Sequence, residues 1–188
     1  MTVADGIRHR RSPRRPRGGF TLIETALATI IVGTGVLAIV AAQQAFFRKN
    51  EWSTHASTAQ RLGNEIRELT LHLPRLDPVT ADAFWGPEPG EPSVEDFDDL
   101  DDFDGEDGGG TVFSAALGNG PVSALGFPID DMAGWSQRVF VEYVDPFDVT
   151  RTVADGASDM VRVRVIVEYQ GPADDAPREI TRVTWIAP

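Results

Sequence analysis

The sequence of 188 residues contains no cysteine and only three histidines. The lack of cysteine excludes a disulfide framework, a thiol nucleophile and a cysteine-ligated zinc site. There is also no nucleophile elbow, phosphate-binding glycine loop, zinc-spaced histidine pair or catalytic triad, so we predict that the protein is not an enzyme. The alternative is a glycosidase that uses a pair of aspartates. It would require a pocket between residues 95–107 and the predicted sheet.

Positive charge is scarce outside the first 19 residues. Residues 1–19 hold six arginines and one acid, a net charge of +5, whereas the remainder has 11 basic and 28 acidic side chains, a net charge of −17. An acidic body repels nucleic acid and anionic lipid surfaces, so we expect no nucleic-acid partner. A basic head in front of an apolar run keeps that end in the cytoplasm, so we expect the acidic part to be exported.

One long apolar run follows the basic head. Residues 25–42 are 18 consecutive uncharged, mostly apolar positions, long enough to enter a bilayer as a helix together with their flanks. Glu24 is the only charged residue between Arg17 and Arg48. An isolated carboxylate near the start of such a helix is costly and therefore indicates a functional role. Directly before the run stands the string Gly18-Gly19-Phe20-Thr21-Leu22-Ile23-Glu24.

This string, with the basic residues before it and the apolar run after it, resembles the N-terminal signature of type IV prepilins and pseudopilins. The resemblance implies cleavage between Gly19 and Phe20 by a prepilin peptidase, N-methylation of Phe20, and use of Glu24 in assembly. After cleavage the new α-amino group of Phe20 would lie one helical turn from Glu24. Because an unpaired carboxylate is costly in apolar surroundings, we expect Glu24 to pair with that amine, either its own or that of a neighbouring subunit.

The finer resemblance is to minor pilins and pseudopilins, because Ala41 stands where major pilins usually carry a proline. Residues 35–44 are most similar to minor pilins of the V type, and residues 97–105 resemble those of the mannose-sensitive haemagglutinin type. The resemblance implies a single-pass protein of the inner (cytoplasmic) membrane that joins other subunits in a type IV pilus-like filament. The alternatives are a type II secretion pseudopilus component and a monomeric, signal-anchored protein that binds a ligand or a cation.

Beyond residue 43 the chain becomes polar but keeps a helical period. Apolar residues recur at spacings of three and four, which places them on one helix face. Pro74 and Pro78 end this pattern, so we predict a nearly continuous helix over about residues 21–72, with His55 and His72 on its surface or rim rather than as ligands. The predicted apolar face consists of Trp52, Ala56, Ala59, Leu62, Ile66, Leu69 and Leu73.

Alternating apolar and polar residues predict strands over 138–144, 160–169 and 179–186, with a shorter strand over 122–129. The expected fold class is α+β: a long N-terminal helix, transmembrane and then amphipathic, packed on a C-terminal antiparallel β-sheet, as in pilins. The predicted divisions are a basic leader (1–19), a transmembrane or filament-core helix (20–43), an amphipathic helix (44–76), an acidic loop rich in Pro, Gly and Asp (77–121) and a β domain (122–188).

The densest negative charge lies within residues 95–107. Carboxylates at adjacent and alternate positions before a glycine suit a hard, oxygen-seeking cation, so calcium is a possible cofactor although none is required. The candidate ligands are Asp99, Asp101, Asp102 and Asp104. Two metal-free alternatives remain, an ordered loop and a disordered one. The three-residue spacing of Phe97, Leu100 and Phe103 favours a short helical turn docked on the core.

Overall fold

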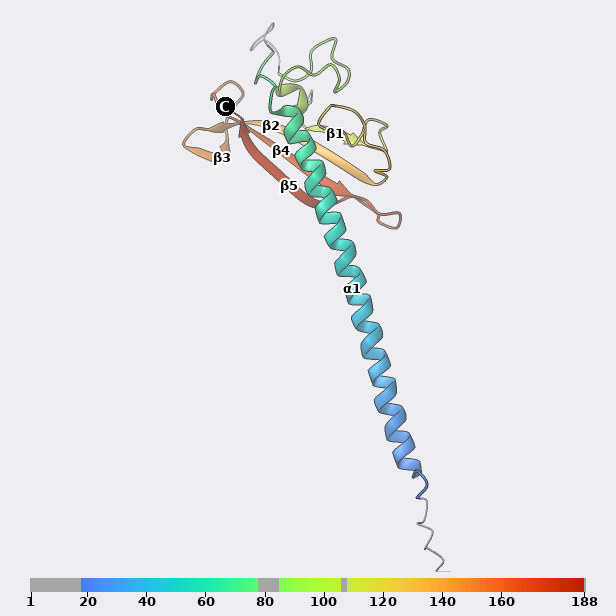
Figure 1. Cartoon of the computed structure of the whole chain (residues 1–188). Helices are drawn as coiled ribbons and strands as arrows, with labels where there is room; N and C mark the ends of the chain where they lie inside the picture. Colours follow the sequence, from blue (N-terminus) through green and yellow to red (C-terminus); the bar gives the residue numbers. More distant parts are fainter. Residues whose placement is uncertain (1–17, 78–84, 106–107, 188) are drawn as a thin grey trace, which may run out of the picture. The chain divides into compact units, whose positions relative to one another are not determined.

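The computed structural model describes residues 18–77, 85–105 and 108–187 (Figure 1). Of the predicted basic leader, only Gly18 and Gly19 fall within these residues. The chain divides into two compact units, Met1–Arg48 and Lys49–Pro188. The elements in chain order are α1 (Leu22–Thr70), the 3-10 helix η2 (Asp101–Asp104), β1 (Thr111–Ser114), β2 (Trp135–Asp145), β3 (Asp148–Thr152), β4 (Val161–Tyr169) and β5 (Arg178–Ala187).

The described part of the first unit is the first half of α1 with the four residues before it, Gly18 to Thr21. Every residue from Gly18 to Arg48 is exposed. The apolar side chains follow one another around the whole helix surface, and none of the most apolar 18-residue window is buried. By length and composition this half of α1 could cross a membrane. The large exposed side chains include Leu22, Ile23, Leu27, Ile30, Ile31, Val32, Val36, Leu37, Ile39 and Val40.

The second unit contains an antiparallel sheet with the strand order β1-β2-β4-β5, and β3 pairs with the end of β2. The three predicted long strands are confirmed as β2, β4 and β5. Val139 lies opposite Val165, and Val165 lies opposite Val183. Valines at alternate positions therefore form a continuous apolar surface across the sheet.

The strand predicted over residues 122–129 is wrong. Only an isolated bridge joins Val122 to Pro128. Between them the chain turns at Ser123, whose carbonyl accepts a hydrogen bond from the Gly126 N–H at 2.9 Å. Gly126 has a φ of 79°, which an extended strand cannot contain. Two short strands that the sequence analysis did not predict, β1 and β3, pair with β2.

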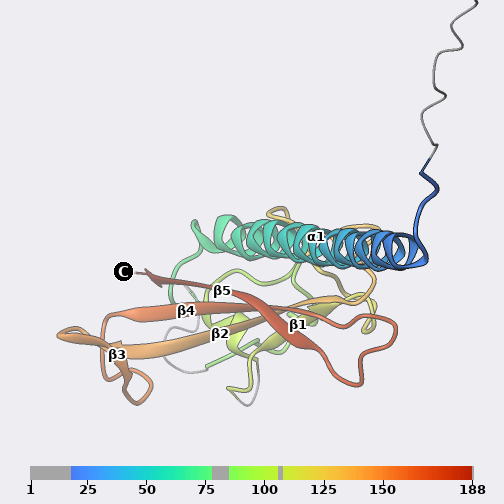
Figure 2. The ribbon, with the colours of Figure 1, turned by 90° about the horizontal axis from the view of Figure 1, so that it is seen from below.

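The second half of α1 covers the apolar face of the sheet (Figure 2). Ala59, Leu62 and Ile66 are fully buried and share one core with the valines of β2 and β4. The long helix on an antiparallel sheet confirms the predicted α+β class. The prediction for Trp52 is wrong, since this side chain is 62% exposed. One turn later His55 already lies at the rim of the sheet, with its ring 4.4 Å from that of Tyr169, so Trp52 precedes the covered surface.

Gln137 ties three segments of this unit together from inside the core. Its side chain is fully buried. Its Oε1 accepts a hydrogen bond from the Val122 N–H at 2.7 Å, and its Nε2 donates to the carbonyls of Leu62 at 2.9 Å and Val122 at 3.1 Å. One side chain of β2 thus holds α1 and the segment after β1, with every polar atom of the amide engaged.

Candidate functional site

The predicted cleavage site lies in an exposed segment directly before α1. Gly18, Gly19 and Phe20 are exposed, and the Phe20 side chain retains 84% of its accessible surface. A helix of 49 residues begins two positions after Phe20. The bond between Gly19 and Phe20 is therefore outside regular structure and exposed.

Glu24 and Thr21 form a capping box at the start of α1. The Glu24 N–H donates to the Thr21 Oγ1 at 3.3 Å, and the Glu24 Oε2 accepts from the Thr21 N–H at 3.3 Å and from the Thr21 hydroxyl at 3.4 Å. The Glu24 N–H also donates to the Thr21 carbonyl at 3.0 Å, whereas the Thr21 N–H is a helix-terminal amide whose acceptor is the Glu24 side chain. The pattern Thr-x-x-Glu before an apolar run is the sequence signal for this cap, and the sequence analysis missed it.

The capping box gives Glu24 a structural role besides the predicted role in assembly. Its carboxylate reaches back to the backbone nitrogen of Thr21, the residue next to Phe20. A new amino group on Phe20 would therefore arise one residue from an amide that Glu24 already binds. The geometry is compatible with the predicted pairing of Glu24 with the Phe20 amine.

The acidic segment around η2 is docked on the core. Leu100 and Phe103 retain only 2% and 1% of their accessible surface, and the Phe97 ring packs edge-on against Phe103 at 5.1 Å. The docked helical turn indicated by the spacing of these three residues is present. The four candidate aspartates are buried with it. A solvated, disordered run does not describe residues 97–105.

Asp101 and Asp104 hold other segments of the chain to η2. The Asp101 Oδ2 accepts a hydrogen bond from the Gly86 N–H at 3.0 Å. The Asp104 Oδ1 accepts from the Val141 N–H at 3.1 Å, and its Oδ2 accepts from the Trp85 Nε1 at 3.1 Å. These two carboxylates therefore join residues 85–86 and β2 through η2.

Asp99 and Asp102 instead bind the backbone of their own turn. The Asp99 Oδ1 accepts from the amides of Asp101 and Asp102, at 3.0 and 3.3 Å. The Asp102 Oδ2 accepts from the amides of Asp98 and Asp99, at 2.9 and 3.2 Å. Among the described residues, the second oxygens of Asp99, Asp101 and Asp102 are buried without a hydrogen-bond partner.

Carboxylates from two segments converge at this turn. One ligand oxygen from each of Glu88, Asp99 and Asp102 lies within 4.8 Å of the other two, and Asp102 forms a second such group with Glu91 and Asp98. Of the four predicted ligands, the structure thus brings together Asp99 and Asp102, and adds Glu88, which the sequence analysis did not name. Asp101 and Asp104 belong to neither group.

The burial of these carboxyl groups makes their charged forms costly. Burial raises the pKa of Asp99 to about 8, and the neighbouring Asp101 carboxyl adds to the shift. Burial likewise raises the pKa of Asp102 to about 6 and that of Glu91 to about 7, and it raises the pKa values of Asp101 and Asp104. No Arg, Lys or His within the described ranges forms an ion pair with Asp99 or Asp102.

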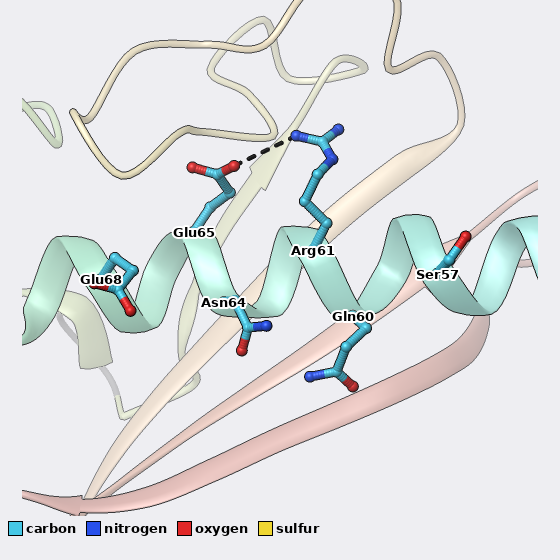
Figure 3. A pocket seen from close by; sticks show the side chains of 6 residues that line it. All are labelled: Ser57, Gln60, Arg61, Asn64, Glu65 and Glu68. Atoms are coloured by element: carbon cyan, nitrogen blue, oxygen red, sulfur yellow. Dashed lines mark hydrogen bonds and ion pairs between the residues drawn. The ribbon is translucent and has the colours of Figure 1, made fainter.

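Two hollows lie elsewhere on the second unit. A shallow one follows the exposed face of α1, where Arg61 and Glu65 form an ion pair at 3.4 Å (Figure 3). The other, of about 290 Å³, lies between residues 92–97 and β1, where a glycosidase site would be expected. Its described lining includes one carboxylate, Glu95, whereas that chemistry requires two.

The structure thus offers two candidate sites. One is the exposed Gly19–Phe20 bond with the capped helix that follows it, and the other is the group of buried carboxylates around η2. No protein-family model, curated protein or solved structure matches the chain.

Proposed function

We propose that the protein is a minor pilin or pseudopilin subunit. In this proposal a prepilin peptidase cleaves the chain after Gly19, Phe20 becomes N-methylated, and the first half of α1 anchors the subunit in the cytoplasmic membrane before assembly into a type IV pilus-like filament. The acidic second unit is exported. The observation that carries the proposal is the fully exposed, apolar first half of α1, which has the lone carboxylate Glu24 in its first turn and follows the exposed Gly19–Phe20 bond.

The exposed half of α1 needs a partner. An apolar surface of this length cannot stay in water, and lipid tails or other apolar helices are the two environments that would cover it. Lipid alone gives no favourable place to Glu24, because a carboxylate loses its hydration there. A bundle of such helices gives Glu24 a favourable place, provided that a cation lies at the same depth in the bundle as the Glu24 carboxylate.

Hydrolysis of the Gly19–Phe20 bond supplies that cation. Water adds across the peptide bond, Gly19 keeps the carboxylate, and Phe20 keeps a protonated amine. N-methylation leaves this amine positively charged. When helices pack side by side, the amine of one subunit can neutralise Glu24 of the next, and the charge pair fixes the axial register of the two helices. Before assembly, pairing of Glu24 with the Phe20 amine of the same chain would neutralise the carboxylate in the membrane.

The proposal is tested first by mass spectrometry of the mature protein. We expect an N-terminus at Phe20 with one added methyl group. A mature protein that retains the arginine-rich leader would contradict the proposal and support the monomeric, signal-anchored alternative. If processing occurs, deletion of the gene distinguishes the two filament types: loss of surface filaments indicates a type IV pilus, and loss of protein secretion indicates a type II secretion pseudopilus.

The capping box allows the charge of Glu24 to be separated from its role as a cap. In Glu24→Gln the side-chain oxygen can still accept from the Thr21 amide, but the charge is lost. We expect this variant to be processed and to enter sheared filaments poorly, as measured by immunoblotting against the membrane pool. Thr21→Ala is the matched control, since it removes the cap, at a cost of about 1 kcal/mol, and keeps the charge.

We expect Thr21→Ala to assemble nearly as well as the unmodified chain. The opposite pattern, normal assembly of Glu24→Gln and failure of Thr21→Ala, would show that Glu24 serves as a helix cap and that its charge has no part in assembly.

A further inference from the structure

The carboxylates of Asp99 and Asp102 differ from that of Asp104 in what they bind. Asp101 and Asp104 accept hydrogen bonds from Gly86, Trp85 and β2, and so connect parts of the fold. Asp99 and Asp102 each use one oxygen to hold the turn and keep the other buried without a partner among the described residues. The turn is thus complete without these two oxygens.

A buried carboxylate oxygen without a hydrogen-bond partner is costly, and this turn holds three of them among the described residues, on Asp99, Asp101 and Asp102. Asp99 and Asp102 are both 0% exposed, so bulk water does not solvate them. Glu88 brings a third negative group to the same place from a segment 11 residues away in the sequence. In the described part of the chain, no basic side chain forms an ion pair with Asp99 or Asp102 to offset this charge.

We propose that Glu88, Asp99 and Asp102 together bind one calcium ion. Calcium binds oxygens at about 2.4 Å, so two of its ligands lie at most about 4.8 Å apart. The three carboxylate oxygens meet this limit. Calcium accepts six to eight oxygens in irregular geometry, which suits ligands from an irregular segment and a single 3-10 turn. Zinc prefers nitrogen and sulfur ligands, and neither group contains histidine or cysteine.

The second group, Glu91, Asp98 and Asp102, shares Asp102 with the first, so the two compete for one carboxylate. We assign the ion to the group with Glu88 and Asp99 because it is the more buried. Asp98 is exposed and keeps its hydration when charged.

The ion would act as a clamp between residues 85–91 and η2. The hydrogen bonds of Asp101 and Asp104 already join Trp85 and Gly86 to η2. The ion would add a second link through Glu88, two residues after Gly86. This inference is independent of the proposed function, because it concerns only the second unit and requires neither cleavage nor assembly.

The test uses the full chain purified in detergent micelles and stripped of metal with a chelator that is then removed. Calcium chloride is titrated in, binding is measured by isothermal titration calorimetry, and melting is followed by near-ultraviolet circular dichroism. We expect a saturable heat and a rise in Tm of about 5–10 °C when free calcium is about 100-fold above its Kd. Magnesium chloride at the same concentration should give a smaller rise.

Three variants define the site. Asp99→Asn retains the oxygen that accepts from the backbone of the turn, and Glu88→Gln retains the size of its side chain. Both should weaken calcium binding at least tenfold. Glu95→Gln is the matched control: it removes one charge from the same segment at an exposed position outside both groups, and it should bind calcium as the unmodified chain does.

Metal-free Asp99→Asn should melt at or above the temperature of the metal-free parent, because it removes a buried carboxyl oxygen without a partner among the described residues and keeps the oxygen that holds the turn. A purely structural role for Asp99 predicts the reverse. The inference is overturned if the parent chain shows neither heat nor a Tm shift at millimolar calcium, as expected if a proton shared between carboxyls takes the place of the ion. It is equally overturned if Asp99→Asn or Glu88→Gln binds calcium as tightly as Glu95→Gln.

Discussion

Gly63 offers a test of how α1 is seated on the sheet, because two effects of opposite sign meet there. The residue is buried in the second half of α1, two turns before its end, and a Cβ added to it would lie 2.5 Å from the Cγ2 and 3.3 Å from the Cβ of Val183 on β5. In a helix without tertiary contacts, Gly→Ala stabilises by about 1 kcal/mol. A methyl group forced into a packed core costs about 1–3 kcal/mol.

The clash should prevail in Gly63→Ala. A contact of 2.5 Å is about 1 Å shorter than an ordinary carbon–carbon separation, and rotation of the Val183 side chain leaves its Cβ in place. We therefore place the steric cost near the upper end of its range and expect a net loss of about 1–2 kcal/mol in the free energy of unfolding. Urea denaturation of the full chain in detergent micelles, followed by near-ultraviolet circular dichroism, measures this loss.

A double-mutant cycle with Val183→Ala isolates the contact. Once the valine methyls are removed, Gly63→Ala should become neutral or stabilising by up to about 1 kcal/mol, which corresponds to a coupling energy of about 1–3 kcal/mol. Asn64→Ala, at the next and exposed position of the helix, is the control and should be stabilising by a few tenths of a kcal/mol. A gain of about 1 kcal/mol from Gly63→Ala in the original background would refute the close approach of α1 to β5.

Three further substitutions probe the interior of the second unit by the same urea denaturation. Gln137→Met should lower the free energy of unfolding by about 2–4 kcal/mol, because it removes three hydrogen bonds and leaves the Val122 N–H buried without its acceptor. A loss below about 1 kcal/mol would contradict this account. Phe103→Ala should lower the free energy of unfolding by about 3–5 kcal/mol, because its ring is buried in the core. Phe97→Ala, at a half-buried position, should lower it clearly less. Equal losses would argue against the docking of η2 on the core.

Much of the fold could be predicted from the sequence because its main elements have strong periods. The long helix was predicted over about residues 21–72 and is found over Leu22–Thr70. The three long strands were predicted from alternation, and Val161, Val163, Val165 and Val167 are indeed all buried on one face. In a long periodic segment many residues match the expected pattern independently, so a single atypical residue does not change the predicted secondary structure.

The short elements could not be predicted, for physical reasons. The four residues of β1 are too few to establish an alternation. The five residues of β3 are all exposed, so burial selected no pattern there. Residues 122–129 have the composition of a strand, but the turn at Ser123–Gly126 prevents one. The close approach at Gly63 depends on Val183, which is 120 positions away in the sequence.

The acidic segment shows the same division between local and distant information. The spacing of Phe97, Leu100 and Phe103 was enough to predict a docked turn, because these residues are neighbours along the chain. The grouping of Asp99 and Asp102 with Glu88 depends on how residues 85–91 return to η2. The different roles of Asp101 and Asp104 depend on hydrogen bonds to Gly86 and β2, and charge density alone does not reveal them.

The outer edge of β5 bears on how copies of this chain could meet. Among the described strands, β5 pairs with β4 alone, so its other side offers unpaired amides and carbonyls. Strand addition at such a border is a common route to uncontrolled association. Here the pairing of β5 is interrupted by a bulge opposite Val167 and Glu168, and Arg178 and Arg182 place charges along the strand. An irregular, charged border is a poor template for another strand, so the edge of β5 disfavours uncontrolled pairing between copies of the chain.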